Sequence, residues 1–246
     1  MNVKVAIVTG SSRGIGRAIA LQLGREGFCV TVNYRQNQEQ AAEVVESIIA
    51  SGGRAIAVEA DVSGSAGADK LIAKTIEEYG QIDVLVNNAG INKDQLLLRI
   101  SDAEWEQVIN TNLGAAFYCS RAALKHMVRK RTGRIINISS VVGVTGNAGQ
   151  AHYAAAKSGL LGFTFSIAQE YGRRGITANV VAPGYIQSDM TAALTSEQTA
   201  SIAEKISAGR IGIPEDVAGV VAFLATPQAA YINGQLLRVD GGMASL

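Results

Sequence analysis

The stretch Val3-Lys4-Val5-Ala6-Ile7-Val8-Thr9-Gly10-Ser11-Ser12-Arg13-Gly14-Ile15-Gly16 joins a short apolar run to a glycine-rich turn. The run at 3–8 is predicted to be a strand, and residues 14–26 a helix. Three glycines permit positive φ and a close approach of the backbone, so a pyrophosphate can meet the helix N-terminus. A merely tight turn would account for one glycine but not for three. The spacing is G-x-x-x-G-x-G, which differs from the G-x-G-x-x-G dinucleotide fingerprint.

Outward from this turn, short apolar runs alternate with longer helical patterns along the whole chain. Most runs are uninterrupted, as expected for strands that are buried on both faces of a parallel sheet. The alternation predicts right-handed crossovers and a doubly wound α/β fold, with one domain over residues 1–246. Residues 187–212 break the alternation, and we expect them to form a mobile lid of short helices over the site. An ordinary surface excursion is the alternative. The predicted strands are 3–8, 28–33, 54–59, 83–87, 134–139, 176–182 and 235–239, and the predicted helices are 14–26, 38–51, 65–79, 102–129 (broken near 110), 152–172 and 214–225.

The composition excludes several classes of function. The 246 residues are 48% hydrophobic and carry a net charge of +1, so neither nucleic acid nor an anionic membrane is expected as a partner. Cys29 and Cys119 lie in apolar stretches and are expected to be reduced core residues. His126 and His152 are too few and too far apart to indicate a metal site. The run at 3–8 is too short for a signal peptide, and no window could span a membrane, so a cytoplasmic protein is expected.

A second group of residues indicates acid–base chemistry. Tyr153 follows Ser140 by thirteen positions, and Lys157 lies one helical turn beyond Tyr153, on the same face. An ammonium beside a phenol favours the phenolate, which is expected to lower the tyrosine pKa from its ordinary value of about 10. Ser140 could then hydrogen-bond a substrate oxygen while Tyr153 moves the proton. Ser139 is the alternative hydroxyl, but the spacing to Tyr153 favours Ser140. These groups suit the interconversion of a ketone and an alcohol, with a hydride carrier bound at the glycine turn.

The end of the second predicted strand indicates which nucleotide is bound. NAD-binding folds place an acidic residue there, against the adenosine ribose, but this chain has Asn33-Tyr34-Arg35. Arg35, or Arg13 in the glycine turn, could pair with a 2′-phosphate, which favours NADP(H). Solvated surface arginines are the alternative. Asp61-Val62 follows the third strand, where a carboxylate can accept a hydrogen bond from the adenine amino group. Small residues in Asn87-Asn88-Ala89-Gly90 would let the cofactor lie over the strand ends.

In this order, these stretches resemble the short-chain dehydrogenase/reductase family, and the resemblance covers essentially the whole chain. It implies a Rossmann fold with a parallel seven-stranded sheet in the order 3-2-1-4-5-6-7, helices on both faces, and a homotetramer. It implies that Tyr153 is the acid–base residue, that Ser140 orients the carbonyl, and that Lys157 lowers the tyrosine pKa and holds the nicotinamide ribose. Asn112 would interrupt its helix and help to hold a water that leads to Lys157. The expected cofactor-binding residues are Gly10, Ser12, Arg13, Gly14, Ile15, Gly16, Arg35, Asp61, Val62, Asn88, Ala89, Gly90, Tyr153, Lys157, Pro183, Gly184, Ile186 and Ser188.

Within that family, the stretches 89–94, 133–143, 146–150, 180–186 and 231–243 resemble the 3-oxoacyl-[acyl-carrier-protein] reductases of fatty acid synthesis. The resemblance implies NADPH-dependent reduction of a 3-oxoacyl thioester, with Ser140, Gln150 and Tyr153 at the substrate. Carrier proteins are acidic, so their docking patch should be basic. Arg131 and Arg174 are the expected docking residues. The alternative is that these cations only complement two helix C-termini.

Other functions remain open at this stage. An acetoacetyl-coenzyme A reductase, a polyketide ketoreductase, or a sugar or polyol dehydrogenase would use the same fold and the same acid–base residues. A non-catalytic NADP-binding sensor is a rival of another class, but the intact set Asn112, Ser140, Tyr153 and Lys157 argues against it. A plastid-type compartment would fit as well as a bacterial cytoplasm. The predicted helices 102–129 and 152–172 are expected to pack against copies of themselves.

Overall fold

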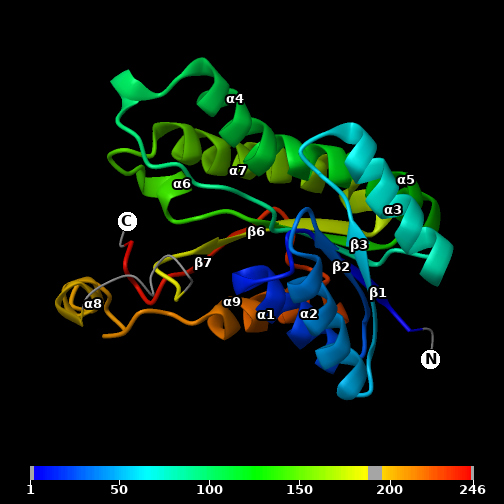
Figure 1. Ribbon diagram of the computed structural model, residues 1–246. Coiled ribbons are helices and arrows are strands. Elements are labelled where there is room, and N and C mark those ends of the chain that lie inside the picture. Colours follow the sequence, from blue (N-terminus) through cyan, green and yellow to red (C-terminus); the bar gives the residue numbers. More distant parts are fainter. Residues whose placement is uncertain (1–2, 188–195, 245–246) are drawn as a thin grey trace.

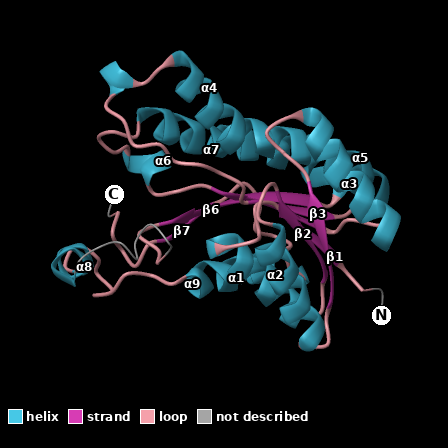
Figure 2. Cartoon of the chain, viewed as in Figure 1, coloured by secondary structure: helices cyan, strands magenta, loops and turns pink. Residues whose placement is uncertain are grey.

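The computed structural model describes residues 3–187 and 196–244. Seven parallel strands form its central sheet, in the order β3-β2-β1-β4-β5-β6-β7 (Figures 1 and 2), so the expected sheet order is confirmed. The strands are β1 Val5–Val8, β2 Cys29–Tyr34, β3 Arg54–Glu59, β4 Val84–Asn87, β5 Gly133–Ile138, β6 Ile176–Pro183 and β7 Leu236–Val239. The helices are α1 Gly14–Arg25, α2 Gln38–Ala50, α3 Ser65–Tyr79, α4 Asp102–Ile109, α5 Ala115–Lys130, α6 Val142–Thr145, α7 Ala151–Tyr171, α8 Ser196–Ala203 and α9 Pro214–Leu224.

The sheet lies between two layers of helices (Figure 1). Helices α1, α2 and α9 cover one face, and α3, α5 and α7 cover the other, with α4 packed against α7. Each face has its own apolar core, which includes Ile19, Leu23 and Val221 on the first side and Leu71, Met127 and Ile167 on the second. Strands β1, β4 and β6 are buried throughout, because they are covered on both faces. This burial explains why their sequences are mainly apolar.

The predicted break in the long helix is a π-helical turn at Asn110–Gly114, which separates α4 from α5. A π-turn inserts one extra residue into the helix, and such turns are frequent at functional sites. Asn112 lies in the turn and is buried. The turn therefore directs a polar side chain inward at the end of the sheet where the site lies.

Four short elements were missed in the sequence, because each is too short to show a helical period. They are the 3₁₀ turns at Leu97–Arg99, Gly172–Arg174 and Pro227–Ala229, and helix α6. The expected lid at 187–212 falls partly outside the described residues. Its described part contains α8, and Ile186 forms a parallel bridge with Gly212.

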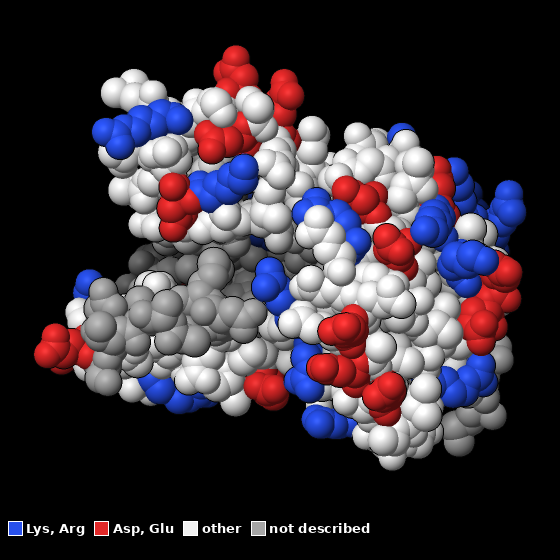
Figure 3. Space-filling view, in the orientation of Figure 1, with Lys and Arg blue, Asp and Glu red and all other residues white. Residues whose placement is uncertain are grey.

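The carboxyl ends of the strands bring the candidate site together. Because all seven strands are parallel, the segments that follow β1, β4, β5 and β6 emerge at the same edge of the sheet. The molecule is hollowed on this side, below α4 and α6 (Figure 3). On the face of the molecule that Figure 3 shows, basic and acidic side chains are interspersed.

Candidate active site

The glycine turn between β1 and α1 is closely packed. Gly10 has φ +60° and Gly14 has φ +55°, values that disfavour residues with a side chain. A Cβ on Gly16 would lie 2.4 Å from Gly10 O and 2.5 Å from Asn88 Nδ2, so only glycine fits there. Helix α1 begins at Gly14 without a side-chain cap, which leaves the amides of its first turn available to an anion. These features fit the pyrophosphate of a dinucleotide.

Side chains from two neighbouring strands hold the turn in place. Asn88 Nδ2 donates to the carbonyl oxygens of Thr9 and Gly10, at 2.9 and 3.0 Å. The Thr9 hydroxyl accepts hydrogen bonds from the amides of Asn88 and Ala89, at 2.9 and 3.0 Å. On the other side, Gly10 N donates to Asn33 Oδ1 at 3.1 Å. Asn88 and Ala89 therefore lie directly against the predicted nucleotide turn.

Of the other residues predicted to bind the cofactor near this turn, some are buried and one is exposed. Ser12 is buried, and Ile15 packs against the core on the α1 side. Arg13 is exposed at the N-cap position of α1. Val62 is buried in the core on the α3 side. Ile15 and Val62 therefore contribute at least as much to the fold as to any ligand.

Arg35 and Asp61 lie together beside this turn. Their Nη1 and Oδ2 atoms are 3.7 Å apart, and both side chains are about half exposed (48% and 52%). Both line an open cavity of about 530 Å³, which Lys70 also lines. The side chain and backbone amide of Ser63 donate to Asp61 Oδ1, and these hydrogen bonds are the main reason that the pKa of Asp61 is lowered. An exposed ion pair of this length is weak, so a phosphate could compete for Arg35.

Ser140, Tyr153 and Lys157 are brought together by β5 and α7. Ser139 is buried and its hydroxyl donates to Lys157 O at 2.8 Å, which holds α7 against the end of β5. Ser140 instead contacts Tyr153 through its hydroxyl. The buried Lys157 Nζ donates to Ile138 O at 2.8 Å and lies 5.7 Å from the centroid of the Tyr153 ring. This geometry favours Ser140 over Ser139 as the functional hydroxyl.

Burial controls the electrostatics of these groups. Burial raises the pKa of Tyr153, the hydrogen bond from Ser140 acts in the opposite direction, and the Asp94 carboxylate raises the pKa further. The lowering expected from Lys157 is therefore wrong in its net direction, because loss of hydration penalises the phenolate more than the surroundings stabilise it. Burial also lowers the pKa of Lys157 to about 8. The pair thus combines a phenol that holds its proton with an ammonium that can release one near neutral pH.

Asn112 is close to Lys157, across Gly90. Asn112 Nδ2 donates to Ile91 O and Val108 O, both at 2.8 Å. Its buried Oδ1 has no hydrogen-bond partner among the described residues. A Cβ on Gly90 would lie 2.5 Å from that Oδ1 and 3.5 Å from Lys157 Nζ. The unpaired oxygen faces a position where a donor is needed, which is compatible with the expected water.

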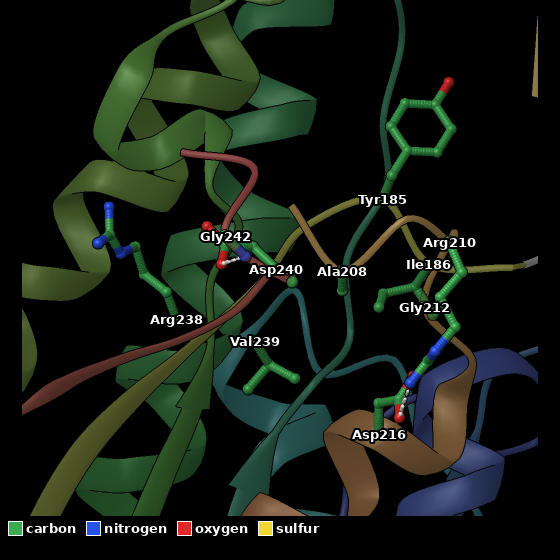
Figure 4. Close-up of a pocket in the computed structure, with 11 residues that line it drawn as sticks. Tyr185, Ile186, Ala208, Arg210, Gly212, Asp216, Arg238, Val239, Asp240 and Gly242 are labelled. Carbon is green, nitrogen blue, oxygen red and sulfur yellow. Dashed lines mark hydrogen bonds and ion pairs between the residues drawn. The ribbon is translucent and has the colours of Figure 1, made fainter. Parts of the chain in front are cut away.

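The segment after β6 borders a separate cavity of about 360 Å³ (Figure 4). Pro183 is the last residue of β6, and a Cβ on Gly184 would lie 2.7 Å from Asp240 Cα. Ile186 is buried and lines this cavity. Arg210 and Asp216 point toward each other there, with two hydrogen bonds of 2.7 and 2.9 Å. Ser188 lies outside the described residues.

The residues predicted to contact the substrate and those predicted to dock a carrier protein lie at opposite ends of the sheet. Gln150 immediately precedes α7, and its Nε2 donates to Asp94 Oδ1 at 2.7 Å. Arg131 ends α5 with φ +55°, and its Nη2 donates to Arg173 O at 3.2 Å, which places it close to Arg174. These arginines precede β5 and β6, at the amino ends of the strands. The two predicted docking residues are therefore neighbours, but they lie far from Tyr153.

A buried polar network, which was not predicted from the sequence, lies beneath the site. Asn87 Nδ2 donates to Asn137 Oδ1 at 2.7 Å and to Ser120 Oγ at 3.0 Å. Asn137 Nδ2 donates to Thr164 Oγ1 at 2.7 Å. The network joins β4, β5, α5 and α7. Polar residues within otherwise apolar strand sequences were the available signal.

The described parts of the chain contain neither a metal-ligand cluster nor a membrane-spanning helix. No group of three or more His, Cys, Asp or Glu side chains there could hold a metal ion. No helix within residues 3–187 and 196–244 is long and apolar enough to cross a membrane.

Comparison with known proteins agrees with this geometry. The short chain dehydrogenase family model matches residues 4–199. The 3-oxoacyl-[acyl-carrier-protein] reductase of Synechocystis sp. is 52% identical over 244 residues, covering 99% of this chain and 98% of that protein. The corresponding reductase FabG of Staphylococcus aureus is 50% identical and covers 98% of both chains. A solved short-chain alcohol dehydrogenase structure from Sinorhizobium meliloti 1021 has a TM-score of 0.94 at 36% identity, covering 99% of this chain and 97% of that one. The chain therefore belongs to the short chain dehydrogenase family.

Proposed function

We propose that this protein reduces 3-oxoacyl-[acyl-carrier-protein] to the 3-hydroxyacyl product, with NADPH as the hydride donor, in fatty acid synthesis. The observation that carries the proposal is the grouping of Ser140, Tyr153 and Lys157 at the carboxyl end of β5, on the same edge of the sheet as the glycine turn. The proposal is also supported by two 3-oxoacyl-[acyl-carrier-protein] reductases that match the chain over nearly its full length. Membership of the family implies a nicotinamide cofactor.

In the proposed reaction, one residue orients the ketone and another transfers the proton. The bound nicotinamide would supply the hydride for the 3-oxo carbon. The Ser140 hydroxyl would donate a hydrogen bond to the ketone oxygen, and Tyr153 would protonate that oxygen as negative charge develops on it. A Tyr153 pKa raised by burial suits a proton donor, because the phenol then remains protonated at neutral pH. Lys157 would hold the ribose and stabilise the phenolate that remains.

Arg35 supports the choice of NADPH over NADH. Its guanidinium lies at the end of β2, beside the cavity of about 530 Å³, and its pairing with Asp61 is long and half exposed. A 2′-phosphate would offer shorter, charge-assisted hydrogen bonds. Arg35→Gln should therefore raise the KM for NADPH by roughly tenfold or more and leave the KM for NADH nearly unchanged. Lys70→Gln, which removes another cation from the same cavity, is the control, and an equal effect of both substitutions would reject Arg35 as the specificity residue.

The position of the predicted docking patch, which consists of Arg131 and Arg174, bears on how several chains would assemble. Helix α7 has 21 residues and is about 31 Å long, with Tyr153 near its start and Arg174 just beyond its end. A carrier protein on this patch is therefore remote from the Tyr153 of the same chain. Antiparallel packing of α5 and α7 against a second copy would bring the patch of one chain toward the site of the other.

An apolar groove supports such an assembly. It lies between α5 and α7, has a volume of about 610 Å³ and includes Phe117, Leu124 and Phe163. Phe117 is 40% exposed, and exposed apolar patches often mark surfaces that contact another protein chain. We propose a homotetramer that uses this face. Sedimentation should show an oligomer that Phe117→Glu dissociates, and a wild-type monomer at working concentration would reject it.

The loss of NADPH absorbance tests the function directly. Acetoacetyl-carrier-protein and acetoacetyl-coenzyme A should be compared, with a sugar plus NADP⁺ as a third substrate. Preference for the carrier-linked ester, reduced by Arg131→Glu or Arg174→Glu but not by Arg25→Glu on α1, would support the proposal. Equal turnover of the coenzyme A ester would indicate general acyl metabolism. Oxidation of the sugar alone would reject the proposed substrate.

A further inference from the structure

Asp94 joins two loops that are distant in the sequence. It lies between β4 and α4, and its Oδ1 accepts a hydrogen bond from Gln150 Nε2 at 2.7 Å and one from Asn92 Nδ2 at 2.8 Å. A backbone hydrogen bond of 2.8 Å, from Gln95 N to Gly149 O, runs beside this contact. Because two bonds cross between the loops, the loop after β4 is tied to the turn that precedes α7.

Gln150 transmits this contact to the helix that carries Tyr153. It occupies the N-cap position of α7, where its side chain does not cap the helix. Its Oε1 instead accepts a hydrogen bond from Asn147 Nδ2 at 3.0 Å, so both ends of the side-chain amide are held. Its backbone carbonyl accepts the bond from Ala154 N at 2.7 Å. Tyr153 lies three residues beyond Gln150, in the first turn of the helix.

We propose that Asp94 is a positioning residue for the reaction: by holding Gln150, it fixes the first turn of α7 and so sets the Tyr153 phenol against Ser140. The role in catalysis rests on the function proposed above. The site residues expected from the sequence did not include Asp94. Its carboxylate is exposed, so its side chain is not required to fill the core.

The charge of Asp94 also reaches the phenol. Its carboxylate adds to the effect of burial and raises the pKa of Tyr153. Lys157 and His152 flank Tyr153 on α7, and His152 Nδ1 accepts a hydrogen bond from Tyr153 N at 2.9 Å. On α4, Glu104 interacts with His152 and with Lys93 of the preceding loop. Asp94 is the only carboxylate among these described groups that acts on the Tyr153 pKa.

A titration that needs no substrate tests the charge effect. The phenolate absorbance of Tyr153 is obtained as the difference between each protein and its Tyr153→Phe counterpart. Asp94→Asn can still accept a hydrogen bond from Gln150, but it removes the charge, so the Tyr153 titration should move to lower pH. Glu106→Gln removes one carboxylate from an exposed position on α4 and should leave the titration in place. A titration that is unchanged in Asp94→Asn, or shifted equally in Glu106→Gln, would show that the Asp94 charge does not act on the Tyr153 phenol.

Kinetics test the positioning role. Asp94→Asn should keep kcat/KM near the wild-type value at neutral pH and move its alkaline limb to lower pH. Asp94→Ala also removes the acceptor for Gln150 and should lower kcat/KM by about tenfold, mainly through kcat. An Asp94→Ala protein with wild-type kcat would overturn positioning. If the wild-type protein were inactive on thioesters, the proposed function would be rejected. The substrate-free titration would still show whether Asp94 affects the Tyr153 pKa.

Discussion

Replacing Lys157 with methionine should abolish activity and at the same time remove a large penalty on the fold. The Lys157 side chain is buried, and burial lowers its pKa from 10.5 to about 8. Methionine has a similar length and carries no charge, so it can occupy the same space. The site therefore keeps a charged group at the expense of stability, as is common where function requires a buried charge.

The size and sign of the effect follow from the pKa values. A shift from 10.5 to about 8 corresponds to about 3 kcal/mol, at roughly 1.4 kcal/mol per pH unit. Because the pKa is lower in the folded state, the penalty is complete below pH 8. It disappears as the pH rises through 10.5, where the unfolded chain also loses the proton. Loss of the Nζ hydrogen bond to Ile138 O offsets about 1 kcal/mol of the gain at neutral pH.

Urea denaturation at fixed protein concentration measures this effect. The free energy of unfolding of the wild type, minus that of Lys157→Met, should rise by about 3 kcal/mol between pH 7 and pH 10.5. Lys70→Met replaces an exposed lysine and is the matched control, for which the difference should stay nearly constant. A flat difference for Lys157→Met would refute the reasoning, since it would mean that burial does not penalise the charged form.

Three further predictions concern single residues. Gly90→Ala places a Cβ 2.5 Å from Asn112 Oδ1, so it should lower stability by about 1 to 3 kcal/mol and remove most of the activity. Gly219→Ala adds a Cβ in open space on α9 and should instead stabilise the protein in denaturation assays. Burial raises the pKa of Cys119 to about 12, so its alkylation at pH 8 should follow unfolding; rapid modification of the native protein would contradict this. Tyr153→Phe should lower kcat by a factor of at least about 100 while fluorescence titration shows unchanged nucleotide affinity.

The regular elements could be predicted because their signals are local. Residues 54–59 and 65–79 were predicted with the observed bounds, since an apolar run or a helical period within one segment suffices. The glycine turn was visible for the same reason: its three glycines lie within seven residues. Tyr153 and Lys157 are one helical turn apart, so their common face also follows from local geometry.

Other properties depend on contacts between distant segments. The contact of Asp94 with Gln150 spans 56 positions, and that of Asn87 with Asn137 spans 50. The raised pKa of Tyr153 is likewise a property of its surroundings, because the sequence shows the neighbouring lysine but not the loss of water around the phenol. Placing Arg131 and Arg174 at the far end of the sheet required the direction of each strand.

The amino-acid order was thus sufficient to predict the alternation of strands and helices, the glycine turn and the grouping of a serine, a tyrosine and a lysine. Each of these follows from the spacing of residues within one segment, or from an order of segments that resembles the short-chain dehydrogenase/reductase family. Only the folded chain decided how deeply Tyr153 and Lys157 are buried, which loop holds Gln150, and where the basic patch lies relative to the site. Hydration and long-range hydrogen bonding depend on which surfaces meet, and that is settled by the packing of the helices on the sheet.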